Sequence, residues 1–423
     1  MGRLNNIFAT AFVLAAFLAC ESKSLEQPQP DNTGSSSYIP IEFGVDIVDT
    51  RAQIVEGGEN ATLNSLGVIG YQYANQAGSN WNTAKSTTRP NVFENQPQTL
   101  TLNGNYYDIE DNSDPATGEP YSWSGNKYAF FAIYPIPNDV NKDYLQLSDN
   151  ATPNTPYAIY TLDTSDEANM ADVMTSSRMD LTAASRYVTF HMVHRLSAVD
   201  VEVHNIYEHS WKIDETTYYE NLDIEITDLL LTFTNLHYNS SRIYLDAIGN
   251  SVPAASDGYS GKAAYHLILE GTDASVEVPF KYNDDDPNFQ LTADKGMSLF
   301  FIPQKQDNLE VEVQVKFMKK FRNDMDTSAL PDGSYIEKEG SIYLINDNVD
   351  YTYDDGGNVT GSANADGYGT EYFYAKKTTA FEQSLDEGYR YYVNLNFTSA
   401  AVSINIITAA QWDDKDKIDH EFE

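Results

Sequence analysis

The chain has 423 residues, with 63 acidic and 26 basic side chains and a formal net charge of −37. Such a surface repels the phosphates of nucleic acids and of anionic lipids, which counts against both as partners held by charge. A length of 423 residues is typical of two or three domains, and a hydrophobic fraction of 41% is enough for their cores. The abundance of Tyr (30) and Phe (19) favours strands.

The N-terminus predicts an export signal that ends at the only cysteine. One positive charge, Arg3, precedes the apolar run "IFATAFVLAAFLA", which is followed directly by Cys20. Thirteen residues are too few to span a bilayer but suit the apolar region of a secretory signal. Small residues before a lone Cys are similar to a bacterial lipobox. At such a motif signal peptidase cuts before the cysteine, here Cys20, and the thiol receives lipid. An ordinary signal peptide with an incidental cysteine is the alternative.

A polar tether and a strand follow the cysteine. Residues 21–38, "ESKSLEQPQPDNTGSSSY", lack apolar periodicity and are rich in Pro, Gln and Ser, which predicts a flexible linker. The next stretch alternates apolar and polar residues as a half-buried strand does. Its apolar face comprises Ile39, Ile41, Phe43, Val45 and Ile47. Soon after it comes Arg51, one of few basic residues, followed by Ala52.

The remaining elements are expected to be strands too. Apolar runs stopped by proline occur at 126–137 and 297–304, and alternating runs occur at 309–317 and 389–398. The run 222–236 changes phase near Asp228, which predicts a bulge. The best candidate for a helix is the short stretch 165–179. Many strands between Gly, Asn, Asp and Pro clusters indicate an all-β fold of antiparallel sandwiches.

Catalytic and metal-binding patterns are weak. His191 and His194, three apart on a strand, point to opposite faces, and His194 is better explained as a core or interface histidine. The acidic loops 283–288 and 346–367 hold oxygen ligands suited to Ca²⁺, but neither matches the EF-hand register. Solvated turns built from Asn, Asp and Gly are the better explanation of both loops. The sequence assigns no catalytic residue, no metal site and no cofactor, and we expect no enzyme.

An early strand and a later Phe-Phe strand ended by proline occur twice in the same order, which indicates two similar domains meeting near residue 185.

Several segments, spread over nearly the whole chain, resemble those of a known protein family. They are "LAC" at Cys20, "DTRA" at 49–52, "YSWSGNKYAFFAIYP", "ADVM", "VTFHMVHRLSAVDVEV", "LFFIPQ" and "GYRYYVNLNF…INIITAAQWDD". Together they resemble the FimA/Mfa-like fimbrillins, lipoprotein precursors of type V pilus subunits in Bacteroidales.

The resemblance implies an all-β fold of two transthyretin-like antiparallel β-sandwich domains in tandem. It also implies a maturation path, in which a lipid-anchored precursor at the outer membrane is cut after an arginine by an arginine-specific surface protease. On this chain the cut falls between Arg51 and Ala52 and releases the strand of Ile39, Ile41, Phe43, Val45 and Ile47. A strand of another subunit then fills the groove. The candidate donor face comprises Val402, Ile404, Ile406 and Trp412.

These expectations divide the chain into four parts. They are a signal peptide with lipobox (1–20), a tether with the removable strand (21–51), and domains at 52–185 and 186–423. The expected partners are other fimbrial subunits in a homo- or hetero-polymer, the protease, and host or bacterial surface receptors or glycans. Two alternatives stay open: a tip or accessory adhesin, and a lipid-anchored protein that binds glycans through exposed aromatic side chains. The candidates for such side chains are the many tyrosines and Trp81, Trp123, Trp211 and Trp412.

Overall fold

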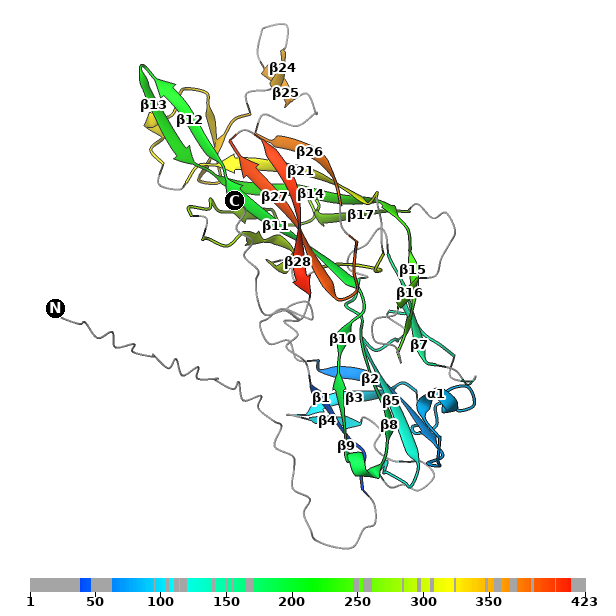
Figure 1. The fold of residues 1–423 in the computed structure, drawn as a ribbon. Helices are drawn as coiled ribbons and strands as arrows, with labels where there is room; N and C mark the ends of the chain where they lie inside the picture. Colours follow the sequence, from blue (N-terminus) through cyan, green and yellow to red (C-terminus); the bar gives the residue numbers. More distant parts are fainter. Residues whose placement is uncertain are drawn as a thin grey trace, which may run out of the picture. The chain divides into compact units, whose positions relative to one another are not determined.

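Strands make up nearly all of the regular structure, so the fold is all-β, as the sequence predicts (Figure 1). The computed structural model describes residues 39–46, 63–94, 96–103, 106–109, 114, 120–138, 141–149, 151, 153, 155–163, 170–245, 251–253, 261–283, 285–294, 298–304, 308–322, 325–346, 349–353, 359–364, 371–381, 384–399 and 401–411. Its helices are the single turns α1 (Trp81–Ala84) and α2 (Leu291–Asp294) and 3-10 turns at Ala183–Ser185 and Thr327–Ala329. Among these residues no helix is long and apolar enough to cross a membrane.

The first sheet has eight strands in the order β10-β8-β5-β2-β3-β4-β1-β9. Their bounds are β1 Glu42–Asp46, β2 Ser65–Tyr73, β3 Gln98–Asn103, β4 Tyr106–Ile109, β5 Lys127–Tyr134, β8 Met174–Leu181, β9 Tyr187–His191 and β10 Val193–His194. The two ends of this order, β9 and β10, are separated in the chain by Met192 alone. The sheet therefore closes on itself, because one stretch of chain pairs with β1 at its start and with β8 at its end.

The closed sheet surrounds a core that we call the ring core. Its buried members are Ile41, Phe43, Leu63, Leu66, Val68, Phe93, Leu100, Tyr107, Ile109, Tyr121, Trp123, Tyr128, Phe130, Ala132, Met174, Leu181, Val188, Phe190 and Met192. The opposite faces of β2 and β5 contribute Ile69, Tyr71, Phe131 and Ile133 to a second, larger core. Burial on both faces explains why β5 is a continuous apolar run in the sequence rather than an alternating one.

Two further sheets carry the larger core. One contains β11 Ser197–Ile206, β19 Phe289–Gln290, β20 Leu299–Phe301, β27 Tyr389–Thr398 and β28 Val402–Gln411. The other contains β14 Asp223–Leu236, β17 Gly261–Ile268, β18 Val276–Val278, β21 Glu310–Lys320, β22 Tyr335–Lys338, β23 Ser341–Leu344 and β26 Phe373–Ala380. Their inner faces pack together, as the 4.9 Å between the ring centroids of Phe317 (β21) and Phe397 (β27) shows.

The smaller sheets link and extend these layers. A four-stranded sheet joins β6 Leu145–Leu147 and β7 Tyr157–Thr161 to β15 Ser240–Tyr244 and β16 Ser251–Pro253. Two hairpins complete the described elements, β12 Glu208–Ile213 with β13 Thr216–Asn221, and β24 Val349–Tyr353 with β25 Val359–Asn364.

The chain passes from the eight-stranded sheet to β11 through a buried ionic junction. Arg195, 1% exposed, lies between β10 and β11, and its Nε is 3.0 Å from Oε1 of Glu387, just before β27. Close by, the backbone N–H of Gly388 donates to the carbonyl of Leu196 at 3.0 Å, and Ser197 Oγ donates to the carbonyl of Asp386 at 2.8 Å. Burial lowers the pKa of Arg195 and the charge of Glu387 opposes that shift. The junction ties the start of β11 to the start of β27.

Three predictions made from the sequence can be compared with the observed strands. The bulge near Asp228 is confirmed, because the pairing of β14 with β21 shifts register between Ile226 and Asp228. The helix expected at 165–179 is wrong over its second half, since Met174 opens β8. The expected domain boundary at 185–186 falls before β9 and β10, which pair within the eight-stranded sheet.

Candidate functional site

The backbone of β1 is held on both sides. It pairs in parallel with β9 over five residues, from Glu42 opposite Tyr187 to Asp46 opposite His191, and antiparallel with β4 at Phe43 opposite Tyr107. Just before β1, the N–H of Ile41 donates to the carbonyl of Tyr121 at 2.9 Å, and the N–H of Trp123 donates to the carbonyl of Ile39 at 2.9 Å. Without β1, the edges of β4 and β9 would lose their shared partner. We call the space that β1 occupies between them the β1 slot.

The side chain that fills the slot is Phe43. It is 1% exposed and stacks on Phe190 of β9 with ring centroids 5.9 Å apart and an interplanar angle of 7°. Phe130 of β5 meets it edge-on at 5.3 Å, and Phe93 lies tilted at 6.2 Å. Offset and edge-to-face ring pairs are favourable beyond the area they bury. We call these three rings the Phe43 socket, and the buried Ile41 lies in the same core two residues earlier.

The removable face expected from the sequence is only partly placed. Ile41 and Phe43 enter the ring core, whereas Ile39 is 45% exposed and lies before the strand begins. The side chain of Val45 and the whole of Ile47 lie outside the described residues, as do Cys20, Arg51 and Ala52. The alternation therefore predicted the two anchoring side chains, but it could not show that the parallel partner is β9, about 145 residues further along the chain.

Glu42 makes the seating of β1 sensitive to pH. Partial burial raises the pKa of its carboxyl above the ordinary 4.5. A raised folded-state pKa means that the folded chain binds the proton more tightly, so stability is full below pH 4.5 and falls as the pH rises through the folded pKa.

We expect Glu42→Gln to remove this component of the pH dependence of thermal unfolding, which begins as the pH rises above 4.5. The matched control is Glu310→Gln at an exposed position of β21, which should keep the wild-type profile. Identical pH profiles for wild type and Glu42→Gln would contradict the assignment.

The candidate donor strand lies elsewhere in the fold. Val402, Ile404 and Ile406 of β28 pack against the larger core, while Ser403 and Asn405 are exposed, so the expected alternation is present. In the part of the chain that the structure describes, β28 pairs with β27 alone, which makes it an edge strand. Trp412 lies outside the described residues.

The polar and aromatic candidates have structural roles. The buried His194 lies with Nδ1 2.9 Å from Oδ1 of Asp172, whereas His191 is exposed, so the two histidines do not converge. In the acidic loop 283–288, a carboxylate oxygen of Asp286 accepts the N–H groups of Tyr282 and Asn283, which is turn chemistry. Across the described ranges, no group of three or more metal-ligating side chains gathers.

The three described tryptophans are core residues. Trp81, Trp123 and Trp211 are 2%, 6% and 8% exposed, and the indole N–H groups of Trp123 and Trp211 donate to backbone carbonyls. None of these three presents a ring face that a sugar could stack on.

Comparison with known proteins gives structural similarities only. No protein-family model matches the sequence, and no curated protein sequence matches it. The structure is similar to a fimbrial protein from Bacteroides vulgatus (17% identity, TM-score 0.49, covering 88% of this chain and 99% of that one). It is also similar to two proteins named "putative cell adhesion protein". That from Bacteroides ovatus has 12% identity, a TM-score of 0.40 and coverages of 89% and 97%. That from Bacteroides uniformis has 10% identity, a TM-score of 0.40 and coverages of 90% and 99%.

Proposed function

We propose that the protein is a structural subunit of surface fimbriae that polymerises by exchange of β1. The observation that carries the proposal is the seating of β1. It is a short strand inside a closed sheet, and it is anchored by the aromatic socket around Phe43. In the sequence it lies between a polar tether and Arg51. A strand placed in this way can leave without any other element of the sheet being removed.

Cleavage after Arg51 would make the retention of β1 purely non-covalent. Its loss would leave unpaired N–H and C=O groups on β4 and β9 and expose the rings of Phe93, Phe130 and Phe190 to water. Both changes are unfavourable, and one incoming strand relieves both by adding its backbone to the ladders and an apolar side chain to the socket. Uncleaved β1 would keep the subunit monomeric by occupying its own slot.

The donor would come from the C-terminal segment around Val402, Ile404, Ile406 and Trp412. It has the alternation that a slot with one buried face needs, and β28 is at an edge, so fewer ladders hold it than hold an inner strand. Other fimbrial subunits are then the partners, as a homo- or hetero-polymer. A tip or accessory adhesin is the variant of the proposal in which this segment does not donate.

The rest of the maturation path follows the same proposal. The precursor would be lipidated at Cys20, held at the outer membrane by that lipid, and cut between Arg51 and Ala52 by an arginine-specific surface protease. The mature protein would act in adhesion without catalysis. Two tandem sandwich domains fit this path, with the first ending after β10 rather than at residue 185, because β9 and β10 pair with β1 and β8.

Limited digestion tests the proposal. We expect an arginine-specific protease to yield a stable product that begins at Ala52 and forms ladders on gels run without boiling. Arg51→Gln should prevent both, whereas Arg89→Gln, at an exposed residue in a loop, should change neither. N-terminal sequencing reads the cut. A product that begins at Ala52, has lost residues 39–46 and stays monomeric at high concentration would overturn the strand-exchange proposal.

A further inference from the structure

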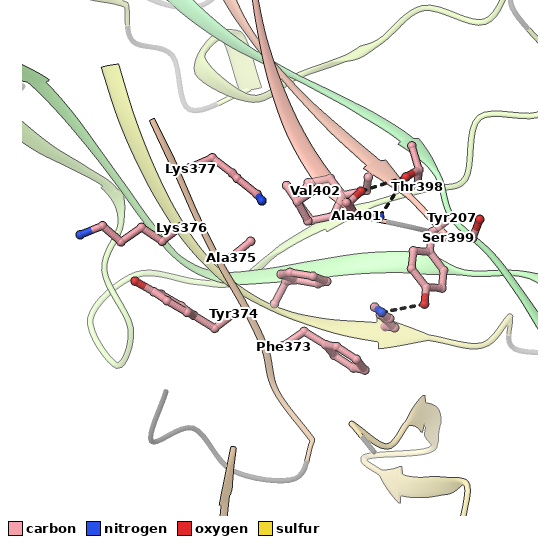
Figure 2. Close-up of a pocket in the computed structure, with 13 residues that line it drawn as sticks. Tyr207, Phe373, Tyr374, Ala375, Lys376, Lys377, Thr398, Ser399, Ala401 and Val402 are labelled. Carbon is pink, nitrogen blue, oxygen red and sulfur yellow. Dashed lines mark hydrogen bonds between the residues drawn. The ribbon is translucent and has the colours of Figure 1, made fainter. Parts of the chain in front are cut away.

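A pocket of about 420 Å³ lies between β26 and β28 (Figure 2). Within the described part of the chain, β26 pairs only with β21 and β28 only with β27, so each is an edge of its sheet. The side chains of Phe317, Phe397 and Val402 give the pocket apolar walls. A free strand edge beside a pocket with both apolar and polar walls offers backbone partners and some burial together, which suits an extended peptide.

The ammonium groups of Lys319 and Lys377 give this pocket a preference for negatively charged groups. Lys319, 7% exposed, donates from Nζ to the hydroxyl of Tyr207 at 2.7 Å, and its Nζ is 3.7 Å from the ring centroid of Phe373. Lys377 is directed across the pocket toward Val402, whereas Lys376 points to the other side of β26 (Figure 2). Nζ of Lys376 is 3.0 Å from a carboxylate oxygen of Glu312. Lysines gathered at one pocket of a chain with net charge −37 favour a carboxylate-bearing occupant.

The chain itself supplies a segment of that chemistry next to the pocket. Twelve residues follow Gln411, the last residue of β28. Within them Ile418, His420 and Phe422 alternate with Asp419, Glu421 and Glu423, so one face would be mainly apolar and the other acidic. This segment lies outside the described residues.

Its length matches the distance that it has to cover. A hairpin loop takes about two to five residues, which leaves about seven to ten residues to run back along β28. At about 3.3 Å per residue these cover roughly 23–33 Å, which is comparable with the length of β28 itself. A segment of this length is therefore long enough to reach the pocket, because Val402 at the start of β28 is one of the pocket's walls.

We propose that residues 415–423 of the same chain fold back antiparallel on the free edge of β28 and dock in this pocket. Phe422 occupies the apolar part, and the side-chain carboxylate of Glu423 lies near Lys377. Tethering directly after β28 raises the local concentration of the segment, which favours the same chain over a second copy. The interaction belongs to the folded monomer and does not rest on the fimbrial proposal.

Disulfide trapping in the full-length chain tests the docking. In a Cys20→Ser background, Ser399→Cys at the exposed rim of the pocket is combined with Glu423→Cys. We expect intramolecular crosslinking in dilute protein about ten-fold faster than for the control pair Ala274→Cys with Glu423→Cys, whose first site is an exposed loop residue. Equal rates for the two pairs would overturn the proposal. Crosslinks only between chains would also overturn it, since the occupant would be a second copy.

Charge reversal tests the role of the lysine separately. Lys377→Glu should slow the Ser399–Glu423 crosslink by about two- to five-fold, the range expected for one exposed ion pair. Lys262→Glu, on the exposed face of another edge strand of the same sheet, should leave the rate unchanged. Equal rates for Lys377→Glu and Lys262→Glu would contradict the assignment of Lys377.

Discussion

Replacing Phe43 by alanine is expected to lower the free energy of unfolding of the uncleaved protein by about 3–5 kcal/mol. The ring is 1% exposed and lies within 6.2 Å, centroid to centroid, of three other rings, so its removal leaves a cavity that neighbouring strands cannot close without distortion. Chemical denaturation followed by aromatic fluorescence and far-UV circular dichroism measures the loss.

The matched control lies four residues earlier in the same segment. Ile39→Ala, at a side chain that is 45% exposed, should change stability by less than about 0.5 kcal/mol. Amide hydrogen exchange adds a local readout, because release of β1 should speed exchange in β4 and β9 before it affects β14 or β21. Similar losses for Phe43→Ala and Ile39→Ala would show that β1 is not anchored by its aromatic socket.

The second large effect is expected at the junction between β10 and β11. Arg195→Leu should destabilise the protein by about 3–5 kcal/mol, because it leaves the carboxylate of Glu387, with a side chain 17% exposed, without the guanidinium 3.0 Å away. Glu387→Gln should also destabilise it, since the guanidinium of Arg195 is buried and keeps its charge.

A double-mutant cycle separates the pair from its surroundings. Arg195→Leu with Glu387→Leu should lose less than the sum of the single changes, because no buried charge is then left alone. Lys376→Gln, which breaks an ion pair whose side chains are 50% and 25% exposed, should change stability by no more than about 1 kcal/mol. If the losses in unfolding free energy of the two single variants simply added up in the double variant, the proposed energetic coupling between Arg195 and Glu387 would be contradicted.

Periodicity predicted the features that depend on local sequence. The alternation around Phe43 identified two anchoring side chains, and the phase change near Asp228 identified a bulge, because each follows from which face of a strand is buried. The helix at 165–179 failed because a short polar stretch has little periodicity, and pairing with β5 decides that 174–181 is a strand.

Contacts between residues far apart in the chain could not be predicted from the sequence. Arg195 and Glu387 are 192 positions apart, and no local pattern of either residue indicates that the two charges meet. The same holds for Lys319 and Lys377, which line one pocket although they belong to different strands. Such pairings depend on how sheets stack and where their edges lie. The hydrophobic periodicity of a single sequence indicates neither.

The parallel pairing of β1 with β9 has a consequence for any strand that takes its place. A replacement that satisfies both neighbours must run parallel to β9 and antiparallel to β4, so it enters with one direction only. Under strand exchange every link between subunits would then repeat the same donor-to-acceptor orientation. Such a contact is heterologous, with different surfaces on its two sides. Unless the rotation between subunits closes a ring, it propagates as a filament with a polarity, one end carrying an empty slot and the other an unused donor.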